Sequence, residues 1–251
     1  MDDPRLTKIL KTLIVRSARP LAAVETSFAI DSSGFSTSRF AKWLDYKYGQ
    51  TKTERQWIKA HIVCGTKTNV ITAASVLHKD SADCPQLPEL LQTTGENFTV
   101  KELAADAAYL SQENMEAITS LGGTPYIAFK DNSTGGVGGT FGKMFHYYSL
   151  NKDEFLKHYH KRSNVETTFS MVKGKFRDNV RSRSDVGMTN EVLCKILSHN
   201  ICCLIQSSFE LGIQAKFWDD VEIEGDETEP AEELELVGAG VDEYLEAMAW
   251  V

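Results

Sequence analysis

The chain has 251 residues, with 27 Lys and Arg against 35 Asp and Glu, which gives a formal net charge of −8. This length suffices for one large domain or two small ones with an ample hydrophobic core. The sequence has no apolar run approaching a membrane span, no signal-peptide core and no cysteine pair at zinc-ligand spacing. On these grounds the membrane-spanning, secreted and zinc-finger classes are excluded, and we expect an intracellular, cytoplasmic protein.

The charge is unevenly distributed along the chain. Residues 218–251 hold 13 acidic residues and no Lys or Arg, which leaves 22 acidic against 27 basic residues in 1–217. Within residues 157–183, eight Lys or Arg accompany only two acidic residues, Glu166 and Asp178. We therefore expect a mildly basic body with one concentrated basic patch, followed by an acidic tail over 216–251. Such a tail is usually a solvated, mobile appendage, and the alternative is that it competes with nucleic acid for the patch.

The first predicted elements are a helix and a strand. The helix spans residues 5–18, and we interpret residues 1–20 as an N-terminal segment that remains from a DNA-binding region. The stretch 23–37 is β-prone and alternates up to Asp31, where Ser32-Ser33-Gly34 predicts a turn.

The remaining elements predict a layered domain over residues 21–215. Residues 56–78 are typical of a β-hairpin, 98–109 of a short buried strand ending near Asp106, and 124–130 of a fifth strand. Helices are predicted at 84–94, 111–123, 151–177 and 189–211, with a glycine-rich loop at 131–140. This order indicates an α/β fold, a mixed five-stranded sheet flanked by helices.

The segment 159–173 places four polar residues on one stripe of the predicted helix. At about 100° per residue, that stripe holds Tyr159, Arg162, Glu166 and Lys173. A neighbouring apolar stripe holds Val165, Phe169, Val172 and Phe176. The helix is therefore expected to bury an apolar seam with Glu166 at the edge of the core. The simpler interpretation is a solvated face with a weak Arg162–Glu166 ion pair.

Two aspartates lie near predicted strand ends, where α/β sheets collect functional side chains. In a sheet of this order the first and fourth strands can be neighbours, which would bring Asp31 and Asp106 together, and a crossing helix would add Glu166. Clustered carboxylates repel one another unless a cation neutralises them, and hard oxygen ligands suit Mg²⁺ or Mn²⁺. Two such ions would activate a nucleophile at a phosphodiester and stabilise the leaving oxygen. Taken singly, Asp31 is more often a turn former and Asp106 a helix-start residue.

The basic patch would then hold the phosphates of a DNA backbone. Its members are Arg162, Lys173, Lys175, Arg177, Arg181 and Arg183. Two further groups have open interpretations. Trp43 and Trp57 could stack on bases, although core packing is commoner. His158 and His160 could touch phosphate or metal, although surface or core positions are commoner.

Three blocks resemble the DDE transposases of bacterial insertion sequences. The spacing Tyr159-(2)-Arg162-(3)-Glu166-(6)-Lys173 resembles the family's Y-(2)-R-(3)-E-(6)-K motif. Asp31-Ser32-Ser33-Gly34 resembles its Asp-Ser-Thr-Gly at the first catalytic aspartate, and Ala105-Asp106-Ala107-Ala108-Tyr109 resembles its Asp-x-x-Tyr second site. The blocks follow in the family's order over about residues 25–210.

The resemblance implies a ribonuclease-H-like catalytic domain that cleaves DNA strands and transfers them at transposon ends, with Mg²⁺ or Mn²⁺, as two ions. Asp31, Asp106 and Glu166 would be the catalytic metal ligands, and Tyr159, Arg162 and Lys173 would position DNA phosphate or brace Glu166. The implied partners are double-stranded DNA (transposon ends and target) and a second copy of the chain in a homodimer on DNA. The alternatives are a catalytically silent, transposase-derived DNA-binding or regulatory protein, and a plain nuclease without strand transfer.

Overall fold

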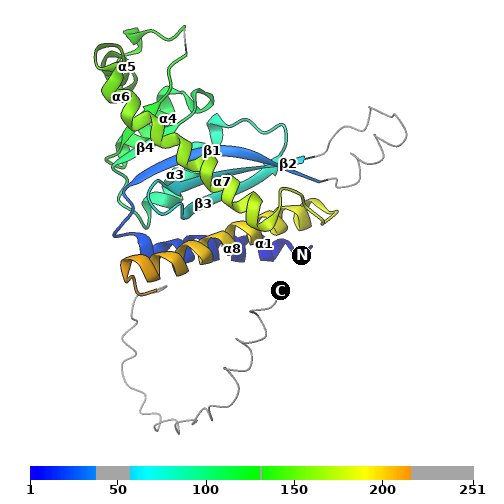
Figure 1. Ribbon diagram of the computed structural model, residues 1–251. Coiled ribbons are helices and arrows are strands. Elements are labelled where there is room, and N and C mark those ends of the chain that lie inside the picture. The colour runs from blue at the N-terminus through cyan, green and yellow to red at the C-terminus, as the bar shows by residue number, and fades with distance from the viewer. Residues whose placement is uncertain (38–56, 131, 216–251) are drawn as a thin grey trace, which may run out of the picture. The chain divides into compact units, whose positions relative to one another are not determined.

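The computed structural model describes residues 1–37, 57–130 and 132–215 (Figure 1). The strands are β1 (Ser27–Ser36), β2 (Trp57–Gly65), β3 (Ile71–His78), β4 (Glu102–Ala105) and β5 (Thr124–Ile127). The α-helices are α1 (Pro4–Ala18), α3 (Leu87–Gly95), α4 (Gln112–Ser120), α5 (Gly139–Leu150), α6 (Lys152–Tyr159), α7 (Ser163–Phe176) and α8 (Asp185–Leu211). Two 3₁₀ turns matter for the site, η3 (Ala107–Tyr109) and η5 (His160–Arg162). Trp43 and the predicted acidic tail over 216–251 lie outside the described residues.

The five strands form one mixed sheet in the order β3-β2-β1-β4-β5. β1, β2 and β3 are successively antiparallel, whereas β4 runs parallel to β1, and β5 parallel to β4. This confirms the predicted α/β class, the five-stranded mixed sheet and the adjacency of the first and fourth strands. The register pairs Ile30 with Ala105. Asp31 is therefore the next residue of β1, and Asp106 directly follows the neighbouring parallel strand β4.

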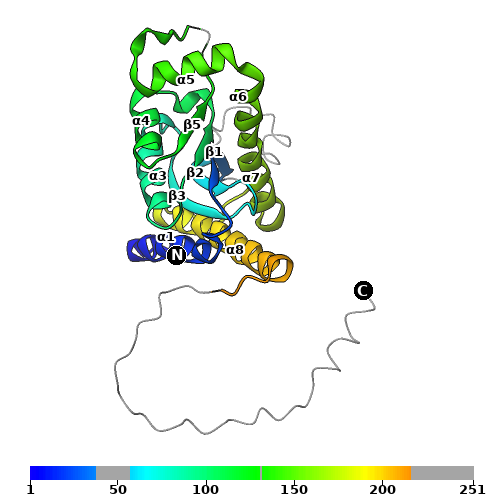
Figure 2. The ribbon, with the colours of Figure 1, turned by 90° about the vertical axis from the view of Figure 1, so that its left-hand side faces the viewer.

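Helices cover both faces of the sheet and one of its edges. In Figure 2, α3 and α4 lie on one side of the sheet, α6 and α7 lie on the other, and α1 and α8 run beneath the β3 edge. α7 contacts β1 and β2, while α1 and α8 both contact β3. The helix that carries Glu166 therefore crosses the strand that carries Asp31.

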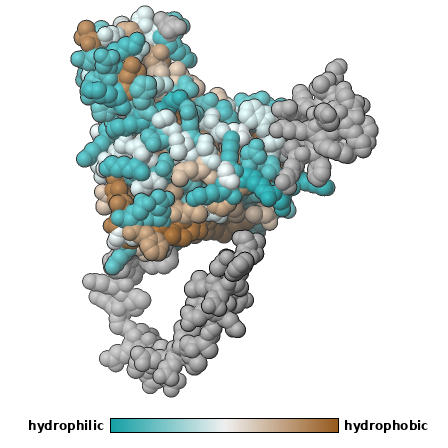
Figure 3. Space-filling view, viewed as in Figure 1, coloured by the Kyte–Doolittle hydropathy of each residue, from teal (hydrophilic) through white to brown (hydrophobic). Residues whose placement is uncertain are grey.

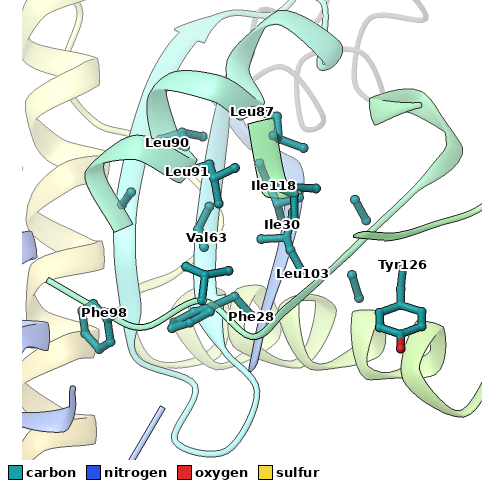
Figure 4. Packing of buried hydrophobic residues seen from close by; sticks show 14 of the residues in the cluster. Phe28, Ile30, Val63, Leu87, Leu90, Leu91, Phe98, Leu103, Ile118 and Tyr126 are labelled. Atoms are coloured by element: carbon teal, nitrogen blue, oxygen red, sulfur yellow. The ribbon is translucent and has the colours of Figure 1, made fainter. Parts of the chain in front are cut away.

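Two hydrophobic clusters fill the spaces on either face of the sheet. On β1, Phe28 and Ile30 point into the cluster beneath α3 and α4, and Ala29 points into the cluster beneath α7. Figure 4 shows the first cluster, in which Phe28 packs near Phe98 and Leu103. This alternation follows from the two-residue period of a strand, and it places Asp31 on the α7 face and Ser32 on the opposite one.

Helix α1 is confirmed, and it packs within the same unit as the sheet. Its start is fixed by Asp3, whose side chain accepts a hydrogen bond from Arg5 N, and by a proline at the first helical positions. The buried amide of Asn200 on α8 reaches both α1 and β3. It donates to Ile14 O at 3.2 Å and to Ile71 O at 2.7 Å, and accepts from Ile71 N at 2.8 Å.

Apolar side chains remain exposed on the outer surface of α1 and α8. They are Ile9 and Leu13 on α1, and Ile201, Ile205 and Phe209 on α8, with Phe209 88% exposed. Figure 3 shows the hydrophobic colour gathering along this lower side of the molecule.

Helix α8 corrects the expectation that no segment approaches membrane-span length. Over Asp185–Leu211 it is long and apolar enough to cross a membrane by length and composition, and half of its apolar window is buried inside the protein. Its buried polar residues Asn190, His199 and Asn200 all have hydrogen-bond partners in the described fold. These features are those of a core helix. The length and apolar composition of α8 are therefore only weak evidence for a membrane span.

Three predicted boundaries were wrong. β1 does not turn after Asp31 but continues to Ser36, because Ser32 to Ser36 remain paired with β2. The single helix predicted over 151–177 is divided into α6, η5 and α7, and α8 begins at Asp185, four residues before the prediction. Helix α5 was not predicted at all, since its segment begins with glycines that disfavour helix formation.

Candidate active site

Asp31 lies in the middle of β1, on the face that α7 covers. Its side chain is 21% exposed, and its Oδ1 accepts a hydrogen bond from the backbone N–H of Ser32 at 2.8 Å. Burial raises the pKa of the Asp31 carboxyl, and the negative charges of Asp106 and Glu166 raise it further, while the Ser32 hydrogen bond and Arg162 oppose the rise. Asp106 and Glu166 therefore both lie within electrostatic range of Asp31.

Asp106 begins the turn that follows β4. Its Oδ1 accepts a hydrogen bond from Ala108 N at 3.2 Å, and its carbonyl accepts one from Tyr109 N at 3.0 Å. Tyr109 is fully buried and anchors this turn in the core. The Asp-x-x-Tyr spacing thus fixes the position of the aspartate through a buried aromatic side chain three residues later.

Glu166 lies in the first turn of α7. The predicted apolar seam is present, because Val165, Phe169 and Val172 are buried and Phe176 packs against their cluster. Glu166 itself is 55% exposed at the margin of this seam. The helix is therefore held by its apolar side while the carboxylate faces the solvent-accessible edge.

Arg162 joins two of the three carboxylates. Its NH1 lies 3.2 Å from Asp31 Oδ2, and its NH2 lies 2.7 Å from Glu166 Oε1. Burial lowers the pKa of this guanidinium, but the surrounding Tyr159, Glu166, Asp31 and Asp106 outweigh burial and raise it. Arg162 is therefore a permanent cation at the centre of the carboxylate group.

The carboxylate oxygens of Asp31, Asp106 and Glu166 are donors that suit a hard divalent cation. In this structure, however, the three side chains are not arranged around one metal position. Within residues 1–37, 57–130 and 132–215, no group of three or more His, Cys, Asp or Glu side chains is placed to hold a metal ion. The guanidinium of Arg162 lies between Asp31 and Glu166 instead. In this conformation the protein supplies its own counter-charge to the site.

The turn η5, which carries Arg162, is tied to the sheet by residues on its N-terminal side. Lys161 Nζ donates to Glu102 Oε1, and His158 Nδ1 lies 2.5 Å from Glu102 Oε2. The His158 ring also stacks on Tyr126, with ring centroids 4.5 Å apart. Of the two histidines with open interpretations, His158 is thus a structural side chain and His160 lies exposed on the surface.

Lys173 extends the site along β1. Its Nζ donates to Ser33 Oγ at 2.7 Å and lies 5.2 Å from the centre of the Phe35 ring. Burial lowers the pKa of Lys173, against the opposing charge of Asp178. Tyr159, the first residue of the predicted polar stripe, is half-buried and packs against the core, with its ring 6.5 Å from that of Phe155.

The remaining predicted DNA contacts lie around the end of α7. Lys175, Arg177 and Arg181 line a cavity of about 310 Å³ together with Phe176, Asn179, Glu191 and Lys195. Arg183 lies exposed beyond it. Lys195 is held by the carbonyls of Arg177 and Asn179, at 3.2 and 2.5 Å. Among the described residues, the four patch cations Lys175, Arg177, Arg181 and Arg183 form no ion pair, and all four are exposed to solvent.

A buried polar group behind Asp31 was not anticipated from the sequence. His61 on β2 is fully buried, with its Nδ1 3.3 Å from Tyr109 Oη and 3.4 Å from Asp83 Oδ1. Lys59 Nζ lies 2.6 Å from the same Asp83 oxygen. Burial lowers the pKa of His61 to about 4, so the ring is neutral at pH 7. The available signal was a single histidine in an apolar strand, directly opposite Ser32 in the register.

Comparison with known proteins gives one family. The family model described as a transposase DDE domain matches residues 23–201, more than two thirds of the chain. The matched range contains Asp31, Asp106, Arg162, Glu166 and Lys173. No individual curated protein gives a significant match.

Proposed function

The chain belongs to the transposase DDE domain family, and from this premise we propose that it is the catalytic domain of a DNA transposase. Its five-stranded mixed sheet flanked by helices agrees with the ribonuclease-H-like fold of that family. The proposed reaction is cleavage of DNA strands at the ends of an insertion sequence, followed by transfer of those strands to target DNA. The site of action would be chromosomal DNA in a bacterial or archaeal cytoplasm.

One observation carries the proposal. Arg162 contacts both Asp31 and Glu166, although 131 and 4 residues separate it from them in sequence. The strand register adds Asp106 beside Asp31. Two carboxylates on two separate elements therefore contact one cation, and the third, Asp106, follows the strand next to that of Asp31. A solvated helix face with a simple Arg162–Glu166 pair would not involve β1.

The proposed roles follow from these positions. Asp31, Asp106 and Glu166 would hold two divalent ions, Mg²⁺ or Mn²⁺. When bound, such ions activate the attacking oxygen and stabilise the leaving oxygen of a phosphodiester. The apolar seam of α7 holds Glu166 at the sheet, and the buried Tyr109 holds the turn that begins with Asp106.

The cations along α7 are proposed to hold the DNA backbone. Tyr159, Arg162 and Lys173 would position the phosphate next to the carboxylates, and Lys175, Arg177, Arg181 and Arg183 would hold phosphates further along the strand. We propose that the chain acts on double-stranded DNA as a homodimer.

A second candidate, a catalytically silent DNA-binding protein, is favoured by one feature. Arg162 already neutralises Asp31 and Glu166, and an arrangement of this kind would also suit a protein that binds DNA without cutting it. Incubation of the chain with Mg²⁺ and duplexes ending in 3′-hydroxyl groups separates these candidates. We expect nicked and joined products with the wild type and none with Asp31→Asn. Duplex binding with neither product under Mg²⁺ or Mn²⁺ would support the silent candidate, and nicked products without joined ones would indicate a plain nuclease.

A further inference from the structure

Arg162 occupies the position between two carboxylates that a metal ion would need. Its two terminal nitrogens lie 3.2 Å from Asp31 Oδ2 and 2.7 Å from Glu166 Oε1. Each of these carboxylates therefore already faces a positive charge of the protein. A divalent ion that is to use both oxygens must compete with the guanidinium.

The backbone that carries Arg162 is held independently of these two ion pairs. Its neighbour Lys161 pairs with Glu102, which also binds His158, and the His158 ring stacks on Tyr126. The Arg162 side chain can therefore change partner by rotation of its own bonds while η5 stays in place.

A DNA phosphate is a suitable new partner for this side chain. Guanidinium groups bind phosphate and carboxylate with the same two-pronged geometry. Arg162 is 22% exposed, and its partner Glu166 is more than half exposed, so the pair is open to solvent on that side. Lys173 lies on α7, which begins directly after Arg162, and reaches the same strand, where it would add a second contact to an approaching DNA backbone.

The geometry points to Arg162 as a resident counter-ion that exchanges between the carboxylates and a DNA phosphate, and so couples divalent-ion binding to DNA binding. When a phosphate withdraws the guanidinium, Asp31, Asp106 and Glu166 repel one another without compensation, which increases their affinity for a cation. By linkage, the ion must increase the affinity for DNA by the same factor. The inference rests on the proposed function, because it takes these three carboxylates as the ligands of the ion.

The first test measures Mn²⁺ affinity of the free protein from the electron paramagnetic resonance signal of unbound Mn²⁺. Arg162→Gln should bind Mn²⁺ about tenfold more tightly than the wild type, because the competing charge is gone. Lys157→Gln is the matched control, since it removes one positive charge from α6, where Lys157 pairs with Glu154 at 2.8 Å outside the proposed site, and it should bind Mn²⁺ as the wild type does. Asp31→Asn should bind more weakly than the wild type. Far-ultraviolet circular dichroism and thermal unfolding establish that each variant is folded.

The second test measures the coupling from the DNA side. Fluorescence anisotropy of a labelled duplex, with and without Ca²⁺, should show that Ca²⁺ tightens binding to the wild type and to Lys157→Gln. The same ion should leave the affinity of Arg162→Gln unchanged.

Two results would contradict the inference, and only the second would also contradict the proposed function. If folded Arg162→Gln binds Mn²⁺ no more tightly than the wild type, while Asp31→Asn binds more weakly, the counter-ion exchange is wrong and the carboxylate site survives. If the wild type, Arg162→Gln and Asp31→Asn all bind Mn²⁺ equally, with and without duplex, the site itself is wrong, and the proposed function fails with it.

Discussion

Replacement of Asn200 by Leu should show that α1, β3 and α8 form one cooperative unit. β3 is an edge strand, and Ile71 directs both its N–H and its C=O away from β2, toward the Asn200 amide at 2.8 and 2.7 Å. Leu is larger than Asn and leaves no cavity, but it cannot hydrogen-bond, so both buried backbone groups are left unpaired. Each unpaired group costs about 1–3 kcal/mol, so the free energy of unfolding should fall by about 4 kcal/mol.

The assay is urea unfolding followed by circular dichroism and tryptophan fluorescence, because a loss of this size is a large fraction of the stability of most domains. Gln206→Ala is the control, since Gln206 is exposed on the same helix and its side chain donates a hydrogen bond to the exposed Glu210 at 2.9 Å. It should change the unfolding free energy by less than about 0.5 kcal/mol. Hydrogen exchange should also accelerate together in α1 and β3 of Asn200→Leu. A loss below about 1 kcal/mol, or faster exchange in β3 alone, would show that Asn200 does not join these elements into one unit.

Three further predictions concern His61, Gly34 and Lys173. Because burial lowers the pKa of His61 from 6.5 to about 4, the unfolded state gains a proton first as the pH falls, and the unfolding free energy should drop by about 2 kcal/mol between pH 7 and pH 5. His61→Gln should remove most of that drop, as measured by urea titrations at each pH. An unchanged fall in the unfolding free energy between pH 7 and pH 5 would show that another group causes it. Gly34→Ala should cost about 1–3 kcal/mol and shift the tryptophan fluorescence, since the new Cβ would lie 2.0 Å from Trp57 Cε3. Gly174→Ala, with open space at that position, should instead stabilise α7 by up to about 1 kcal/mol, and equal effects of the two changes would contradict this account. Lys173→Ala should weaken duplex binding and reduce the slope of log affinity against log salt by about 1; an unaltered slope in anisotropy titrations would exclude a phosphate contact.

The sheet could be predicted because its strands carry strong local signals. Alternating apolar residues and the turn between residues 65 and 71 specify the hairpin of β2 and β3. The chain order allows β1 and β4 to be neighbours, and the structure shows that they are. The end of β1 could not be predicted in the same way. Ser32, Ser33 and Gly34 resemble a turn locally, but pairing with β2 keeps them extended.

The helical part depended more on contacts between distant residues. No proline interrupts residues 151–177, yet the helix changes to a 3₁₀ turn where Lys161 and His158 are drawn to Glu102 on β4. The aromatic residues of α5 pack around Phe129, with Phe141 and Phe145 rings 5.4 and 5.3 Å away, so tertiary contacts outweigh a poor helix-forming sequence.

For the site, sequence spacing was sufficient to select the carboxylates but not their relation to the cations. Helical periodicity placed Arg162 and Glu166 on one stripe, and the structure confirms their ion pair. The second contact of Arg162, to Asp31, depends on how α7 crosses β1, and no local pattern encodes that crossing. The buried His61 and Tyr109 depend likewise on the packing between β2 and the turn after β4.

The proposal that Asp31, Asp106 and Glu166 form one catalytic site is tested most directly by measuring cleavage and duplex affinity together in Glu166→Gln and Lys175→Gln. Glu166→Gln should abolish Mg²⁺-dependent cleavage while its duplex affinity stays within about twofold of the wild type or increases. Lys175→Gln should weaken duplex binding and retain cleavage at saturating protein. Parallel loss of cleavage and affinity in both variants would contradict the assignment of Glu166 as a ligand and of the α7 cations as DNA contacts.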